Sequence, residues 1–201
     1  MQSVRLLGAL LPGVPSDATV TTADIDLFSL NRDVFNPSKY VKDEFHVQGN
    51  HPATVQYQEY PISYLTATSS LWKKVLGFTQ FRPALEALET ATNKKRDWNF
   101  DQVFVYSKVQ QSKVQTRLHP WNDNLRIDFR TNPNAQFFTG AVDCHLLRPA
   151  FIPKNWGHLR ERFLKHVLNQ RQMQEIDEFH KKFMLERPNL HDLRDGRGRR
   201  E

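Results

Sequence analysis

Cysteine is nearly absent from this 201-residue chain, which contains Cys144 and no other thiol. A single cysteine excludes an intramolecular disulfide and a zinc site made of four cysteines. The only Asn-x-Ser/Thr sequence, at residues 36–38, has proline at its middle position and therefore cannot accept an N-linked glycan. Both absences favour synthesis in a reducing compartment and argue against a secreted glycoprotein.

Long apolar runs are also missing. The longest run, at residues 6–11, is interrupted by a glycine and closed by a proline, and it is far shorter than the roughly 18 residues that cross a bilayer. We therefore expect a soluble or peripherally bound protein. The first 24 residues contain Arg5 and no acidic residue before Asp17, a composition that resembles an organellar targeting peptide, although a plain flexible N-terminus explains it equally well. The predicted location is mitochondrial, or otherwise intracellular.

Signatures of catalysis and of cofactor binding are missing as well. The 8 glycines form neither G-x-x-x-x-G-K-[ST] nor G-x-G-x-x-G, the loops whose backbone N–H groups bind phosphates. The 8 histidines are not accompanied by an H-E-x-x-H or C-x-x-C sequence that would suggest a metal site. We therefore predict no enzyme activity, no catalytic residue, no cofactor and no metal ion.

Asp143, Cys144 and His145 are adjacent and have the residue types of an orienting acid, a nucleophile and a base. Consecutive side chains of a strand point to opposite faces, so the thiol of Cys144 could not donate to the neighbouring imidazole. We predict instead that Cys144 is a small core residue and that His145 lies at the surface or at an edge.

Basic residues are in modest excess. The chain has 28 Lys and Arg against 22 Asp and Glu, for a net charge of +6, and most of these charges are interleaved. Clusters of Lys and Arg are the usual feature of proteins that neutralise phosphates. The residues predicted to contact RNA, if any do, are Lys94, Lys95, Arg96, Arg197, Arg199 and Arg200. A solvated loop and a solvated tail are the alternative.

The pattern of prolines, apolar residues and charges predicts four segments. These are an extended N-terminal arm at 1–62, a small α+β domain at 63–154, a long helix at 155–187 and a charged tail at 188–201. Five prolines divide the first segment at intervals too short for long helices. The predicted fold is therefore α+β, with a small antiparallel sheet, a helical hairpin, a long C-terminal helix and an extended arm.

Helical and alternating patterns divide the predicted domain. Leu71 and Val75 have helical spacing, Gly77 is suited to end that helix, and a second helix follows near Pro83. From residue 98 to 151 the apolar residues alternate in period two, which predicts three or four strands, including one at Val103 and Val105. We expect the hairpin to cover the apolar side of this sheet.

The predicted C-terminal helix is too long for its own domain. At about 1.5 Å per residue, residues 156–187 would extend roughly 45 to 50 Å, beyond the width of a small domain. The apolar residues of this helix fall into two groups, one before and one after the polar residues 169–172. The first group can dock on the sheet, whereas the second group needs another surface. The predicted partner-binding residues are Met173, Ile176, Phe179, Phe183 and Met184. Two alternatives remain: the helix bends at residues 170–172 and returns to its own core, or it lies on a membrane.

An overhanging helix and an extended arm are stabilised by neighbouring subunits. The first hypothesis is therefore a non-catalytic accessory subunit of a large multiprotein assembly, of mitochondrial respiratory-chain or ATP-synthase type. The alternatives are a ribosomal or other ribonucleoprotein subunit that contacts RNA, and an enzyme of unknown type.

Overall fold

The computed structural model describes residues 3–24, 27–34, 36–49, 56–94, 99–120, 125–146 and 150–187. The chain forms two compact units, and each is described here by itself. The first unit comprises Met1–Ile25 and Asn36–Asp123, and the second comprises Asp26–Phe35 and Asn124–Glu201. Each unit combines helices with a small sheet, so the α+β class is confirmed. The segment predicted as one domain, 63–154, contributes to both units.

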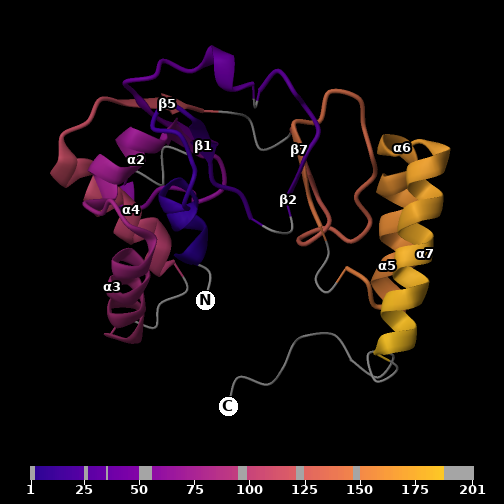
Figure 1. The fold of residues 1–201 in the computed structure, drawn as a ribbon. Coiled ribbons are helices and arrows are strands. Elements are labelled where there is room, and N and C mark those ends of the chain that lie inside the picture. The colour runs from indigo at the N-terminus through magenta and orange to yellow at the C-terminus, as the bar shows by residue number, and fades with distance from the viewer. Residues whose placement is uncertain are drawn as a thin grey trace. The chain divides into compact units, whose positions relative to one another are not determined.

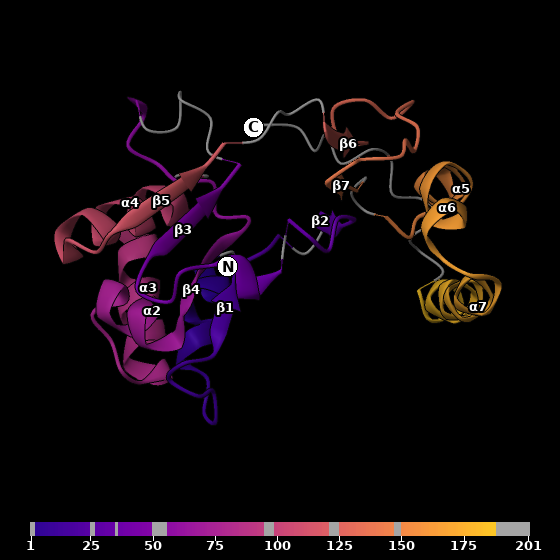
Figure 2. The ribbon, with the colours of Figure 1, turned by 90° about the horizontal axis from the view of Figure 1, so that it is seen from above.

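The first unit contains a four-stranded sheet. Its strands, in spatial order, are β1 (Thr19–Thr21), β4 (Leu65–Thr68), β3 (Phe45–Gln48) and β5 (Thr116–His119). Neighbours β1, β4 and β3 run antiparallel, whereas β5 runs parallel to β3 (Figure 2). The prediction of an antiparallel sheet was therefore wrong, because β3 and β5 come from distant segments whose pairing leaves no local signal.

The described residues of this unit include four long helical segments, in addition to the short 3-10 turn η2 (Pro37–Lys39). They are η1 (Ser3–Leu10, a 3-10 helix), α2 (Ser69–Leu76), α3 (Phe81–Lys94) and α4 (Phe100–Ser112). The hydroxyl of Thr68 caps α2, and Gly77 ends it in the left-handed conformation at φ 76°. The helices predicted on either side of Gly77 are both present.

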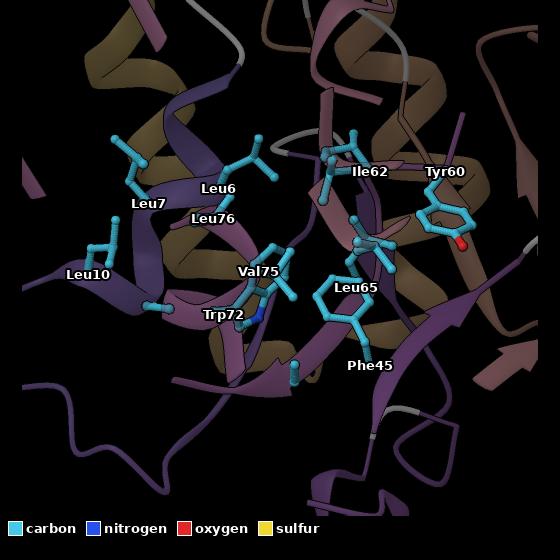
Figure 3. Close-up of a cluster of buried hydrophobic side chains, with 14 of the residues drawn as sticks. Leu6, Leu7, Leu10, Phe45, Tyr60, Ile62, Leu65, Trp72, Val75 and Leu76 are labelled. Carbon is cyan, nitrogen blue, oxygen red and sulfur yellow. The ribbon is translucent and has the colours of Figure 1, made fainter. Parts of the chain in front are cut away.

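The core of the first unit is built around Trp72 and Phe45 (Figure 3). Their rings meet edge to face at 4.8 Å, and the Trp72 indole N–H donates to the carbonyl of Val20 at 3.0 Å. Leu6 and Leu7 of η1 are buried in the same cluster at 1 % exposure. The prediction of an extended N-terminal arm was therefore wrong. The 3-10 helix η1 ends before the first proline, Pro12, so the prolines do not prevent it from forming and burying its leucines.

Helix α4 corrects a third prediction, because Val103 and Val105 were expected in a strand. Val105 and Val109 are buried one turn apart, and Asp101 in the first turn accepts a hydrogen bond from Arg5 at 2.6 Å. Apolar side chains lie on several sides of α4, so its sequence has no clear helical stripe. The alternation of apolar and polar residues that predicted a strand here results from apolar residues placed around the whole helix.

The second unit contains a three-stranded sheet in the order β2 (Leu27–Ser29), β7 (Asp143–His145) and β6 (Arg126–Asp128). Strand β2 runs antiparallel to β7, and β6 runs parallel to it. Arg126 donates to the buried carboxylate of Asp143 at 2.9 and 2.7 Å across the parallel pair. Ile127, Phe129 and Cys144 face the core of this unit.

The C-terminal residues form two helical arms rather than one helix (Figure 1). The first arm consists of α5 (Pro153–Leu159), the π-helix η4 (Arg160–Leu164) and α6 (Lys165–Val167), and the second is α7 (Gln170–Glu186). Leu168 is extended, and Asn169 caps α7, so the chain reverses there. A long C-terminal helix is present, but the prediction that it spans 155–187 was wrong.

Candidate docking surface

Helix α7 packs against its own unit with only one side. The structure describes all 17 of its residues, and none of them is fully buried. Met173 and Ile176 contact the core of the second unit, and Arg160 on the opposite arm donates two hydrogen bonds of 2.9 Å to Asp177. The alternative that the chain bends near residue 170 and returns to its own core therefore describes the path of α7 correctly.

Aromatic rings hold the second half of α7. His180 stacks on Trp156 with ring centroids 4.3 Å apart, and its Nε2 donates to the carbonyl of Phe151 at 2.9 Å. The ring of Phe151 also lies 5.5 Å from Phe179 and 5.3 Å from Phe183. These contacts fix the helix in place but leave more than half of the Phe179 side chain exposed.

Ile176, Phe179 and Phe183 have the i, i+3, i+7 spacing of a line along one flank of α7, and we call them the docking line. Phe179 at its centre is 55 % exposed, whereas its two neighbours are half-buried. Leu185 is 82 % exposed, but it lies on another side of the helix and has no apolar neighbour in the line. A single exposed leucine is ordinary, whereas an apolar line is suited to contact another surface.

The structure thus divides the five residues predicted to bind a partner. Met173 and Ile176 pack against the chain's own core, Phe183 and Met184 are half-buried, and Phe179 is exposed. All five lie on α7 as the helical spacing predicted. Whether they bind a partner stays a prediction.

Of the residues predicted to contact RNA, Lys94 is the last residue of α3. The others, Lys95, Arg96, Arg197, Arg199 and Arg200, lie outside the described residues.

Cys144 is buried in the core of the second unit, as predicted. Burial, followed by the nearby Asp143 and Asp128 carboxylates, raises the pKa of its thiol far above the ordinary value, so the thiolate that a nucleophile needs is not formed. His145 was predicted at the surface or at an edge, but it lies buried on the central strand of its sheet. Its Nδ1 is 3.6 Å from the carboxylate of Asp128.

A group of polar side chains on the four-stranded sheet had no counterpart in the sequence predictions. This polar cluster consists of Tyr40, Glu44, His46, Gln48, Arg117 and His119. Phe45 and Val47 point into the core, so His46 and Gln48, which alternate with them, point to the opposite face. Their meeting with Arg117 and His119 depends on the parallel pairing of β3 with β5, which the sequence did not reveal.

The two histidines of the polar cluster are joined through their rings. His46 Nδ1 lies 2.9 Å from His119 Nε2, and His46 Nε2 lies 3.0 Å from the carbonyl oxygen of Val41. A carbonyl oxygen only accepts, so His46 Nε2 carries the hydrogen. In the neutral state Nδ1 of His46 therefore accepts from the Nε2–H of His119.

An ion pair adjoins the histidines. Arg117 donates to Glu44 at 2.5 and 2.9 Å, and Gln115 donates to it at 2.8 Å. The hydrogen bonds from Arg117 hold the pKa of Glu44 below its ordinary value. Burial, and then the neighbouring His46 and Arg117, lower the pKa of His119, while Glu44 opposes this shift. The neutral imidazole of His119 is therefore favoured.

The polar cluster does not have the arrangement of a metal centre. Among the residues that the structure describes, no three His, Cys, Asp or Glu side chains are placed to hold a metal ion. Glu44 lies 4.0 Å from His46 Nε2, the nitrogen that donates to Val41, and so does not share a site with Nδ1.

Comparison of the chain with protein-family models, with curated proteins and with solved structures finds no match. None of the helices that the structure describes is both long and apolar enough to span a bilayer.

Proposed function

We propose that this chain is a non-catalytic accessory subunit of a large multiprotein assembly, and that it contacts a neighbouring subunit through the docking line of α7. The observation that carries the proposal is the exposure of Phe179 on a helix that buries none of its 17 residues. Burying one large apolar side chain from full exposure contributes roughly 1.5 to 3 kcal/mol, so covering Phe179, which is 55 % exposed, contributes about half of that. A second protein surface would supply that burial.

The type of assembly is the finer part of the proposal. We place a mitochondrial respiratory-chain or ATP-synthase type assembly first, because the composition of residues 1–24 resembles an organellar targeting peptide. Leu6 and Leu7 are packed in the core of the first unit, so a targeting segment at these residues would have to remain on the folded protein. A ribonucleoprotein assembly comes second, through the basic residues predicted to contact RNA.

A pair of variants on α7 tests the proposal. Phe179→Glu places a charge in the docking line, and Leu185→Glu makes the same kind of change at a more exposed position outside the line. Each variant and the wild-type chain would be expressed with a tag in the native cells. The fraction that migrates with a high-mass complex would then be measured by size-exclusion chromatography and blotting.

We expect the wild-type chain and Leu185→Glu to migrate with the complex and Phe179→Glu to migrate as a free chain, with unchanged circular dichroism. Equal loss in both variants, or a wild-type chain that is free at its native concentration, would contradict the proposal. Release of the wild-type chain by ribonuclease would replace the first assembly type with the ribonucleoprotein alternative.

A further inference from the structure

The polar face of the four-stranded sheet is covered by the chain segment that precedes β3. We call residues 36–44 the covering segment. His46 and Gln48 beneath it are 1 % and 3 % exposed. Its own Val41 is 51 % exposed, so the segment is not held by buried apolar side chains. What holds it is a set of polar contacts.

These contacts all reach the polar face of the sheet. The carbonyl of Val41 accepts from His46, the hydroxyl of Tyr40 accepts from the Gln48 side chain, and the carbonyl of Lys42 accepts from Thr68 at 3.4 Å. The ring of Tyr40 lies against both histidines, at 4.8 Å from His46 and 6.0 Å from His119. The histidine pair is therefore at the centre of the anchorage.

The number of protons on the two imidazoles decides whether this anchorage can form. With one hydrogen on each ring, both hydrogen bonds of His46 are satisfied. A first added proton on His119 leaves its Nε2–H donating to His46. A second added proton must occupy His46 Nδ1, and two N–H groups then face each other across 2.9 Å. Two positive charges at that distance also repel each other.

We propose that the His46–His119 pair is a proton-operated clasp, which holds the covering segment on the sheet while at least one ring is neutral and releases it when both are protonated. Release exposes the polar face of β3 and β4, including Gln48 and the buried Thr66. The clasp is a feature of the first unit and is independent of the docking line on α7.

The groups that face the pair do not remove this dependence on protons. From the covering segment, Glu44 attracts a second positive charge, but its carboxylate is bound by Arg117 of β5, whose own charge has the opposite effect. Tyr40 stays neutral, because burial raises the pKa of its phenol above the ordinary value. From β4, the residue paired with His46 is Thr66, which does not titrate.

Hydrogen exchange of one backbone amide measures the clasp directly. The amide of Glu44 donates to the carbonyl of Val41 at 3.1 Å, so its protection reports whether the covering segment is in place. Protection would be measured by NMR in the full chain at pH 7.5 and 5.0, after correction for the intrinsic exchange rates. The matched variant is His119→Gln, whose side-chain N–H can still donate to His46 Nδ1 but cannot take up a proton.

We expect the protection of the Glu44 amide to fall about fivefold or more on acidification in the wild-type chain, the factor that corresponds to one lost hydrogen bond, and to stay within about twofold in His119→Gln. The amides of β3 and β4 should keep their protection in both proteins. An equal fall in both proteins, no fall in the wild type, or a parallel loss in the strands would overturn the proposal. So would ring-nitrogen shifts at pH 7.5 that place the hydrogen of His46 on Nδ1.

Discussion

Replacing Asn169 with alanine should weaken the reversal that turns α7 back onto its own unit. Asn169 Oδ1 accepts from the backbone N–H of Gln172 at 3.0 Å, and Gln172 Oε1 accepts from the backbone N–H of Asn169 at 3.0 Å. This reciprocal pair is a capping box, which satisfies backbone donors that the first turn of a helix otherwise leaves open. Asn169→Ala removes the first of the two bonds.

The expected loss can be worked out from this geometry. Asn169 is exposed, so the substitution creates no cavity and strands no buried group. The cost is therefore that of the cap alone, about 1 kcal/mol, and a glycine at the same position should cost only about 0.3 kcal/mol. Asn169→Ser keeps a side-chain acceptor and should remain close to the wild type.

Urea unfolding followed by far-ultraviolet circular dichroism measures this series. The account predicts midpoints that fall in the order Asn, Ser, Gly, Ala, with an unchanged dependence on urea concentration. If Asn169→Ala unfolds at the same midpoint as Asn169→Ser, the capping box does not determine the start of α7. In that case the reversal has another cause.

Three further predictions concern the first unit and the first arm of the second. Trp72→Phe should lower the free energy of unfolding by about 2 to 3 kcal/mol in a denaturant titration, because it leaves a cavity and removes the indole hydrogen bond to the Val20 carbonyl. Gly77→Ala should lower the free energy of unfolding by about 1 kcal/mol, because Gly77 has φ 76°. Gly157→Ala in α5 should instead raise it by about 0.5 kcal/mol, because alanine favours a helix and no atom lies within 4 Å of the added methyl group. Thermal unfolding of both variants would show whether the signs are opposite. Because the pKa of His119 is lowered in the folded chain, its contribution to stability is present above the unfolded pKa of 6.5 and is lost as the pH falls through the folded pKa. The free energy of unfolding from denaturation curves should therefore fall from about pH 6.5 downward, and it should fall less in His119→Gln.

The parts of the fold that could be predicted from the sequence are those with local causes. The helices on either side of Gly77 have caps, helical spacing and a left-handed glycine within a few residues of one another. The strand at Arg126–Asp128 alternates apolar and charged residues, and it lies in the segment 98–151 where strands were predicted from such alternation. The burial of Cys144 followed from its place in such an alternating segment.

The parts that were missed have causes that are distant in the sequence. In the sequence, β3 precedes α2, α3 and α4 and its parallel partner β5 follows them, so no pattern in either strand indicates the other. The polar cluster depends on that pairing, which explains why His46 and His119 were not predicted to meet. Helix α4 was taken for a strand because its apolar residues are spread around the helix, although its buried residues, Asp101, Val105 and Val109, lie on one face.

One missed feature did have a local signal. The sequence Asn169-Gln-Arg-Gln172 lies inside the single helix that was predicted at 155–187, although Asn followed by Gln three residues later is the pattern of a capping box. Recognising it would have predicted a new helix at residue 170 and a shorter overhang. The docking line would then have been limited to the flank that contains Phe179.

Thiol labelling at position 179 tests the central claim, that the docking line is covered by a neighbouring subunit. Cys144 is buried and does not compete for the reagent, so Phe179→Cys and the control Leu185→Cys would each present one accessible thiol. Alkylation rates would be compared between the purified chain and the native high-mass fraction. The account predicts that position 179 reacts at least about tenfold more slowly in the high-mass fraction, the factor for about 1.4 kcal/mol, while position 185 reacts at the same rate in both. Equal rates at position 179 in the two preparations would contradict it.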